Sequence, residues 1–222
     1  MDLVKKVEDE RNVLIFDLGG GTFDVSVVNI EGELFEVKDT SGNTNLGGAD
    51  FDNCLKDHFV KVLRWDQNKD ISRNSQALRR LQIACEKAKE ILSTTSETTI
   101  EIDSLHEGVD FKTTLTKDSF EEICHGLFET ILKAVDDALQ DARRSRSDIN
   151  EVVVVGGSTR IPKLQSLLQE FMGQRELNKC MNPDEAVAYG AALQAAALTG
   201  LNDDLVGDLF LLDQSSISFE RE

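Results

Sequence analysis

The sequence predicts an α/β fold, with a mixed sheet flanked by helices, from three observations. Three strand-like segments follow one another at short spacing near the start of the chain, as in an antiparallel meander. Residues 149–155 form a further strand, whose four consecutive valines make it apolar on both faces, as central parallel strands are. Long segments between and after these strands carry apolar residues at helical spacing.

The meander strands are expected at 12–16, 23–30 and 34–40. The turn between the first two lies within Asp17-Leu18-Gly19-Gly20-Gly21-Thr22-Phe23-Asp24. Its glycines allow positive φ and close ligand approach, and successive free N–H groups in such a turn can bind an anion. With a carboxylate at each end, this pattern suits a phosphate beside a hydrated divalent cation. An ordinary glycine-rich hairpin is the alternative.

Helices are expected at 50–65 and 75–92, followed by a hairpin with strands at 99–105 and 109–115. The polar face of the second helix carries Glu86, Lys89, Glu90 and Ser93 within two turns. A ligand could lie along these side chains, and a solvated helix face is the alternative.

One long helix is expected from an N-cap at Thr116 toward Arg144. The strand at 149–155 ends in the loop 156–160, and ligands in open α/β sheets bind outside the carboxyl ends of strands. Pro162 suits the first turn of the helix that follows. The loop is therefore a second candidate site.

The last helix is expected to begin at Asn182-Pro183-Asp184-Glu185. Asn182 would be its N-cap, Pro183 its first residue, and Glu185 the partner in a capping box. Small side chains follow as far as Ala196, and they would let this helix pack very close to a neighbour.

The charge balance limits the classes of partner. The 222 residues include 41 acidic and 24 basic side chains, for a net charge of −17, which argues against nucleic acid and anionic membranes as partners.

No apolar run approaches the roughly 20 residues of a membrane span, and the first residues do not form a signal peptide. The four cysteines show no C-x-x-C pairing: they are Cys54, Cys85, Cys124 and Cys180. We therefore expect a soluble intracellular protein with free thiols and no zinc site.

Neither of two common phosphate motifs is present. No stretch fits G-x-x-x-x-G-K-[ST], and the turn at 17–24 lacks the third glycine and the following helix of a dinucleotide fingerprint. Four other motifs occur in order: the turn at 17–24, Leu46-Gly47-Gly48, the segment 155–162, and the segment 182–190. Together they resemble the 70-kDa heat-shock chaperone family, over about residues 3–213.

The resemblance implies an actin-like ATPase fold of the ribonuclease H-like type, of which this chain resembles the second lobe alone. It implies a core subdomain of residues 1–46 and 117–200 and an inserted α+β subdomain of residues 47–116. Residues 201–222 would be the start of an interdomain linker and a tail.

The resemblance also assigns roles to individual residues. It implies catalytic roles for Asp17, Asp24 and Thr22, with Asp17 orienting the attacking water and both carboxylates sharing the magnesium shell through water. The β- and γ-phosphates would face Gly19, Gly20, Gly21 and Thr22, with Gly48 beside them. The adenosine would contact Glu86, Lys89, Ser93, Gly156, Gly157, Ser158, Arg160 and Ile161, with Asp184 near the adenine.

Two positions depart from the family pattern, and one element is missing. Glu90 stands where an arginine usually faces the adenine, and Ala49 stands where an acidic residue is common. No second Asp-x-Gly-Thr loop exists in these residues. We therefore expect an ATP-binding half of a chaperone ATPase domain that does not hydrolyse ATP by itself.

The family implies ATP or ADP with Mg²⁺ as cofactors, whose binding we expect to be weak or absent in this lobe alone. It also implies a cytoplasmic location, shared with the nucleus. Its partners would be J-domain co-chaperones, nucleotide-exchange factors and, through a peptide-binding domain absent here, unfolded polypeptides. Two alternatives stay open: a non-catalytic docking module for co-chaperones, and a lobe of another actin-like or sugar-kinase ATPase.

Overall fold

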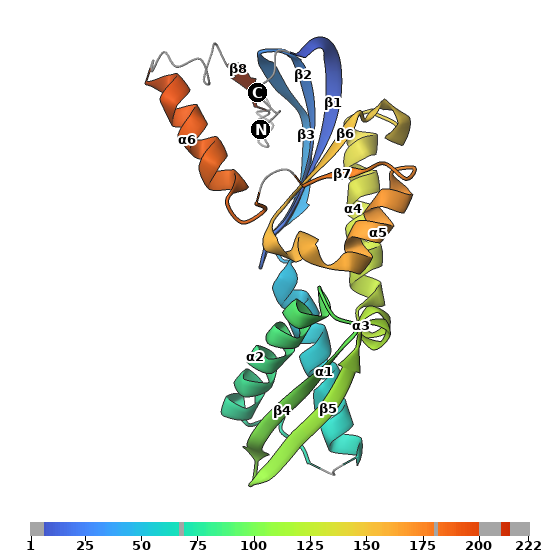
Figure 1. The fold of residues 1–222 in the computed structure, drawn as a ribbon, viewed down its shortest axis with the longest axis vertical. Helices are drawn as coiled ribbons and strands as arrows, with labels where there is room; N and C mark the ends of the chain where they lie inside the picture. The colour runs from blue at the N-terminus through green and yellow to red at the C-terminus, as the bar shows by residue number, and fades with distance from the viewer. Residues whose placement is uncertain (1–6, 67–68, 180–181, 200–209, 214–222) are drawn as a thin grey trace, which may run out of the picture.

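The computed structural model of the chain describes residues 7–66, 69–179, 182–199 and 210–213. A large sheet with its helices lies above a smaller region of two helices and a hairpin in Figure 1. We call the second part, residues 48–116, the helix–hairpin region, and the first part the sheet region. Within the described residues, no helix has both the length and the hydropathy that a membrane span requires.

The sheet region is built on six strands in the order β7-β6-β1-β2-β3-β8. They are β1 (Val7–Leu18), β2 (Phe23–Gly32), β3 (Leu34–Asn43), β6 (Glu151–Val155), β7 (Leu177–Asn178) and β8 (Phe210–Leu212). The first three are antiparallel, whereas β6 pairs parallel with β1, β7 with β6, and β8 with β3. The predicted α/β fold with a mixed sheet is confirmed.

Helices cover the two faces of this sheet unequally. The helices α4 (His125–Asp141) and α5 (Pro162–Phe171) lie on one side, and α6 (Ala186–Leu198) stands on the other (Figure 1). Side chains of β1 and β2 on the α4 side are completely buried, among them Leu14, Phe16, Val25 and Val27. In contrast, α6 has no buried residue. The hydrophobic core therefore lies on the α4 side.

The predicted long helix after Thr116 is wrong in one respect, because it is broken at Cys124 into α3 (Lys117–Ile123) and α4. Cys124 has φ −95° and ψ 8°, outside the helical range. The break brings the rings of Phe120 and Phe128 onto one residue, Phe51, at centroid distances of 6.1 and 5.3 Å. Apolar spacing continues across the break, so the sequence pattern does not reveal it.

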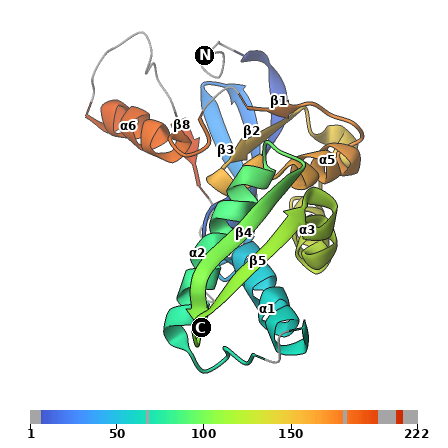
Figure 2. The ribbon, with the colours of Figure 1, turned by 60° about the horizontal axis from the view of Figure 1, so that its bottom comes forward.

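The helix–hairpin region contains α1 (Gly48–Asp66), α2 (Ser75–Leu92), β4 (Glu97–His106) and β5 (Val109–Thr116). Figure 2 shows the two helices behind the hairpin. Leu55 of α1, Leu81 of α2 and Ile100 of β4 are all at most 2% exposed. The rings of Phe59 and Phe111 meet edge to face at 5.6 Å. The two helices and the hairpin thus bury their apolar side chains against one another, in a cluster that continues into the core of the sheet region.

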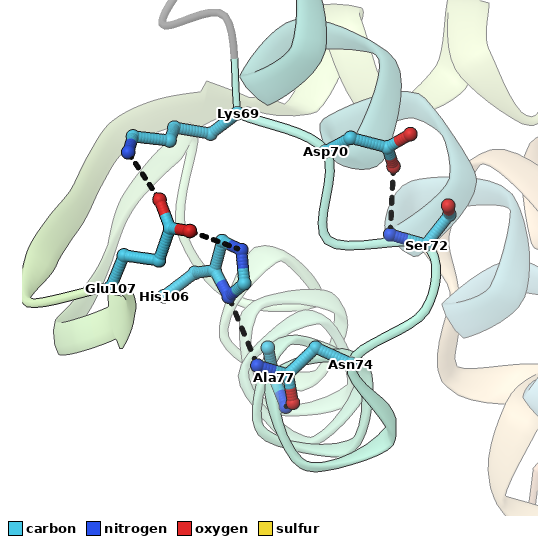
Figure 3. Close-up of polar contacts among 7 residues, drawn as sticks. All are labelled: Lys69, Asp70, Ser72, Asn74, Ala77, His106 and Glu107. Atoms are coloured by element: carbon cyan, nitrogen blue, oxygen red, sulfur yellow. Dashed lines mark hydrogen bonds and ion pairs between the residues drawn. The ribbon is translucent and has the colours of Figure 1, made fainter.

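Asn74 fixes the start of α2 and ties it to the hairpin tip (Figure 3). Its Oδ1 accepts a hydrogen bond from Ala77 N at 3.1 Å, as an N-cap does. Because Oδ1 is used as the acceptor, Nδ2 is the donor to His106 Nδ1 at 3.0 Å. Glu107 of the same hairpin tip forms an ion pair with Lys69, which precedes α2.

The expected helix start at Asn182 is also wrong, because α6 begins at Ala186. The Oδ1 of Asn182 accepts a hydrogen bond from Arg160 Nη2 at 2.9 Å, and the Pro183 carbonyl accepts one from Gly156 N at 3.1 Å. Asn182 Oδ1 also accepts a hydrogen bond from Asp184 N at 3.4 Å, so it bonds both to the turn that precedes α6 and to Arg160. A short 3₁₀ helix, η1 (Arg146–Asp148), joins α4 to β6, and a second one, η2 (Gly157–Arg160), follows β6.

Candidate nucleotide site

The turn between β1 and β2 is tight and open on its outer side. Gly19 N donates a hydrogen bond to Thr22 O at 3.0 Å, and Asp17 lies opposite Asp24 in the strand register. A methyl group added to Gly20 or Gly21 would meet no atom within 4 Å. The backbone at these two positions therefore borders free space that a ligand could occupy.

The first turn of α1 is bonded to this glycine turn. Gly48 N donates to Gly19 O at 2.9 Å, and Ala49 N donates to Gly20 O at 2.8 Å. A Cβ on Gly47 would lie 2.6 Å from Gly21 N, so a side chain does not fit there. The start of α1, where the helix dipole favours negative charge, is thus fixed beside the turn.

The loop after β6 reaches the same turn from another side. Ser158 Oγ donates a hydrogen bond to Gly19 O at 2.9 Å. Gly156 has φ +87°, and a Cβ there would lie 2.2 Å from Leu18 O, so both conformation and space require glycine. The strand β6 is therefore tied to β1 at the carboxyl ends of both strands, where α/β folds bind ligands.

Lys89 of α2 is held against α1 by two groups. Its Nζ donates a hydrogen bond to Gly48 O at 2.8 Å and forms an ion pair with Asp52 Oδ1, also at 2.8 Å. The side chains of Lys89 and Asp52 are only 12% and 7% exposed. Burial raises the pKa of Asp52 above its ordinary value, although the Lys89 charge acts in the opposite direction.

Sequence reasoning missed Asp52. Nothing in the sequence distinguishes Asp52 from other acidic residues. It is one of several that follow the Gly-Gly motif, in a chain that is acidic throughout. A partial signal existed in the placement of Lys89, a cation on the edge of an apolar helix face, for which a buried partner could have been sought.

Arg160 and Asp184 form an ion pair at the rim of the site. Arg160 Nη2 lies 2.8 Å from Asp184 Oδ2, and both side chains are about half exposed. A Cβ on Gly157 would lie 2.9 Å from Asp184 Oδ1, so the segment after β7 packs directly on the start of η2.

These segments surround a cavity of about 600 Å³. It is lined by Gly20, Gly48, Ala49, Asp52, Glu86, Lys89, Glu90, Ser93, Thr94, Gly157, Ser158, Arg160, Ile161 and Asp184. Its volume falls in the range of pockets that hold small ligands and cofactors. The walls come from the glycine turn, the start of α1, the polar face of α2, and η2.

Most of the residues expected to contact a nucleotide line this cavity, including all those expected on α2. The others lie next to it rather than in its wall: Gly19, Gly21, Thr22, Gly156, Asp17 and Asp24. Glu90 and Ala49, the two departures from the family pattern, both line the cavity.

Asp17 and Asp24 form a pair of interacting carboxylates behind the glycine turn. The pKa of Asp17 is raised, first by burial and second by the nearby charge of Asp24. Two hard oxygen donors at the turn fit part of a magnesium shell that water completes. Among the described residues, no group of three or more His, Cys, Asp and Glu side chains could hold a metal ion. The fit is therefore to a partial, water-shared shell.

Comparisons with known proteins give one consistent result. Residues 3–222 match a family model described as Hsp70 protein. A heat shock 70 kDa protein of Neurospora crassa is 55% identical over 221 residues, covering 99% of this chain and 34% of the relative. A ribosome-associated molecular chaperone of Eremothecium gossypii is 56% identical over 214 residues, covering 96% of this chain and 35% of the relative. This chain thus spans about a third of the length of the curated relatives it matches.

Proposed function

Because the chain belongs to the Hsp70 family, we propose that it is the second lobe of a chaperone ATPase domain and binds ATP or ADP with Mg²⁺. One observation supports this above all: four segments far apart in sequence enclose a single cavity beside an open glycine turn. The parent protein would couple ATP hydrolysis to binding and release of unfolded polypeptides. The family match also favours a chaperone over a sugar kinase or an actin-like filament protein.

The cavity offers suitable groups to each part of a nucleotide. The free backbone at Gly20 and Gly21 would receive the phosphates, with the positive end of the α1 dipole beside them. The N–H groups of Gly48 and Ala49 are already bonded to the glycine turn and would not take part. The wall formed by Glu86, Lys89 and Ser93, with η2 opposite, would receive the adenosine. In this arrangement Lys89 keeps its bond to Gly48 O and acts as a fixed wall of the site.

Asp17 and Asp24 would hold Mg²⁺ through water molecules. The bound ion would supply neutralising charge to the phosphates. Asp17 would orient the attacking water through a hydrogen bond to its carboxylate. In enzymes, removing a single preorganised hydrogen-bond donor that stabilises charge in the transition state lowers the catalytic rate on the order of 10²–10³-fold. Without the other lobe and its phosphate loop, this chain should therefore show no turnover above background.

The Gly20→Ala variant tests nucleotide binding with little risk to the fold, because the added methyl group meets no protein atom. We expect Mg·ADP to shift the amide resonances of Gly20, Gly48 and Ser158, with Gly20→Ala weakening binding roughly tenfold, about 1.4 kcal/mol. The matched control is Gly126→Ala in α4, where a methyl group is equally free of contacts. Equal affinity in both variants would place the ligand elsewhere.

A second experiment tests turnover. The chain alone, and the chain combined with the missing lobe taken from the Neurospora crassa relative, are assayed for phosphate release from ATP. Hydrolysis is expected only in the combination and should be lost in Asp17→Asn. Steady-state hydrolysis by the chain alone would contradict the half-site proposal.

Glu90 should weaken the grip on adenine, because a carboxylate cannot stack on the base as an arginine does. In the two-lobed protein, Glu90→Arg is expected to increase ADP affinity several-fold by calorimetry, and Glu90→Gln much less. Unchanged affinity in Glu90→Arg would mean that the base is held by other residues.

The helix–hairpin region also suits a docking role for nucleotide-exchange factors, with J-domain co-chaperones as further partners of the parent protein in the cytoplasm. Its helices expose two large apolar side chains, Trp65 at 84% and Ile83 at 54%. Trp65 is the single tryptophan of the chain, so its fluorescence reports on the surface directly. Binding of an exchange factor should shift its emission to shorter wavelength. An unchanged spectrum together with no complex on gel filtration would count against docking here.

A further inference from the structure

Three cysteines gather where the helix–hairpin region meets α3. Cys54 lies on α1, Cys85 lies on α2, and Cys124 lies at the break between α3 and α4. Cys85 and Cys124 are buried, whereas Cys54 is only partly buried. Cys180 lies outside the described residues.

Cys54 lies beside Cys124. The Cys54 thiol donates a weak hydrogen bond to Ile123 O, at an Sγ–O distance of 3.8 Å, so it lies against the residue that precedes Cys124. The pKa of Cys124 is raised mainly by burial, and next by the nearby Cys54 thiol. Cys85 differs, because the groups that act on its thiol are Asp52 and Lys56 rather than a second thiol.

We propose that Cys54 and Cys124 are a reactive thiol pair, which a hydroperoxide such as H₂O₂ converts into a reversible intramolecular disulfide. This proposal does not depend on nucleotide binding. It rests on the proximity of the two side chains and on their unequal exposure, since the accessible thiol meets the oxidant and the buried one meets only its neighbour.

The reaction balances in two steps. The Cys54 thiolate attacks one peroxide oxygen, an S–O bond forms, the O–O bond breaks, and hydroxide leaves to give a sulfenic acid. The Cys124 sulfur then attacks the Cys54 sulfur, an S–S bond forms, the S–O bond breaks, and the departing hydroxide takes the Cys124 proton. Two thiols lose two electrons in total, and the peroxide becomes two molecules of water. An external dithiol reverses the reaction by exchange.

Burial of Cys124 makes the second step the slow one. A buried thiol with a raised pKa is rarely ionised at neutral pH, so disulfide formation should accelerate as the pH rises. The product would link α1 to the α3–α4 break. The carboxylate of Asp52, which holds Lys89 in the cavity wall, lies close enough to Cys124 to affect its pKa. The disulfide would thus form directly behind that wall.

The test treats the full chain with a stoichiometric amount of H₂O₂, counts free thiols, and maps the cross-linked peptides by mass spectrometry. We expect loss of two of the four thiols, a Cys54–Cys124 peptide, an unchanged monomer on a non-reducing gel, and full recovery with dithiothreitol. The rate should rise between pH 7 and pH 9.

Two variants make the result decisive. Cys54→Ser should abolish the loss of two thiols, and Cys180→Ser should preserve it. Far-ultraviolet circular dichroism verifies that both variants are folded. The proposal is overturned if Cys54→Ser still loses two thiols, if Cys54 pairs instead with Cys85 or Cys180, or if Cys54 reaches the sulfinic acid while Cys124 stays reduced.

Discussion

The helix–hairpin region and the sheet region differ in how completely they bury their apolar side chains. In the first, α1 and α2 pack against β4 and β5, and residues such as Phe111 and Leu115 are only 2% exposed. In the second, α4 and α5 cover one face, while the other keeps an apolar groove of about 370 Å³. Ile15, Ile30 and Val153 line this groove beneath α6, which has no buried residue of its own.

This contrast shows where stability arises within the described residues. The helix–hairpin region buries apolar side chains between its two helices and its hairpin, whereas the sheet does so mainly on the face covered by α4, and the two sets form one continuous core. Apolar residues on the two faces of the same strand should therefore contribute very differently to the free energy of unfolding. The reason is that an apolar side chain stabilises the fold only by the surface area that folding removes from water.

The largest effect should come from the enclosed core. Phe111→Ala removes a buried ring that packs on Phe59, and it should lower the free energy of unfolding by about 3–5 kcal/mol. Ile15→Ala, on the open face, should lower it by only about 1 kcal/mol. Urea unfolding followed by circular dichroism measures both. Equal losses would show that the open face is as well packed as the core.

The next effect tests the buried ion pair between α1 and α2, inside the helix–hairpin region. Lys89→Met leaves the Asp52 carboxylate buried without its cation, and about 3 kcal/mol of stability should be lost. Adding Asp52→Asn to the same chain should recover much of that loss, because no buried charge then remains. Lys112→Met, which breaks the exposed pair with Glu101, should change stability little. If the double variant is less stable than Lys89→Met alone, the pair is not the cause.

A smaller effect is expected at the start of α2. Asn74→Ala removes the N-cap and should reduce the free energy of unfolding by about 1 kcal/mol. Asn74→Asp keeps the acceptor for Ala77 N but loses the amide donor to His106, so it separates the cap from the contact with the hairpin. If Asn74→Asp were as unstable as Asn74→Ala, the lost stability would come from the hydrogen bond to His106 rather than from the N-cap.

The smallest effect should be a gain in stability at the glycine turn. Asp17 has a folded-state pKa above its ordinary value of 3.8, so its charge is less favourable in the folded than in the unfolded chain. Its stabilising contribution is present at low pH and is lost as the pH rises through that raised pKa. Asp17→Asn should therefore raise the melting temperature at pH 7, with the gain shrinking as the pH falls through the raised pKa toward 3.8.

The exposed Asp70 offers a control of opposite sign for this prediction. Hydrogen bonds from Ser72 lower the pKa of Asp70, so its contribution is present at neutral pH and is lost in acid. Asp70→Asn should lower the melting temperature at pH 7. If both variants shift it in the same direction, the explanation by pKa is wrong.

Local patterns in the sequence were sufficient for most of the fold. The alternation around the glycine turn predicted the β1–β2 hairpin, and the double-sided apolar valines predicted β6 as a central parallel strand. Some loop glycines mark positions where no side chain fits, as at Gly156 with its positive φ. Such features depend on a few neighbouring residues and can therefore be found without the structure.

The errors arose where distant contacts override local preference. The helix break at Cys124 depends on the meeting of Phe120 and Phe128 at Phe51, which no spacing rule detects. Asn182 is a favoured cap residue type and accepts a hydrogen bond from Asp184 N, yet regular helix begins only at Ala186, and its oxygen is shared with Arg160. Asp52 matters only because α1 places it beside Lys89. In the candidate site, motifs thus predicted the loops, and only the structure supplied the buried pair between them.

The two edges of the sheet have a consequence for self-association. Unpaired strand edges are templates for other chains, and proteins often limit that risk by ending a sheet in very short strands. Here the sheet ends in β7, with two residues, and β8, with three. Yet β8 exposes the side chains of Phe210, Leu211 and Leu212, each by more than half. The strand β8 pairs with β3 at Leu34–Glu36 and so protects that backbone edge from other chains. Its own apolar side chains remain exposed to water, so self-association would occur through hydrophobic contact rather than through strand pairing.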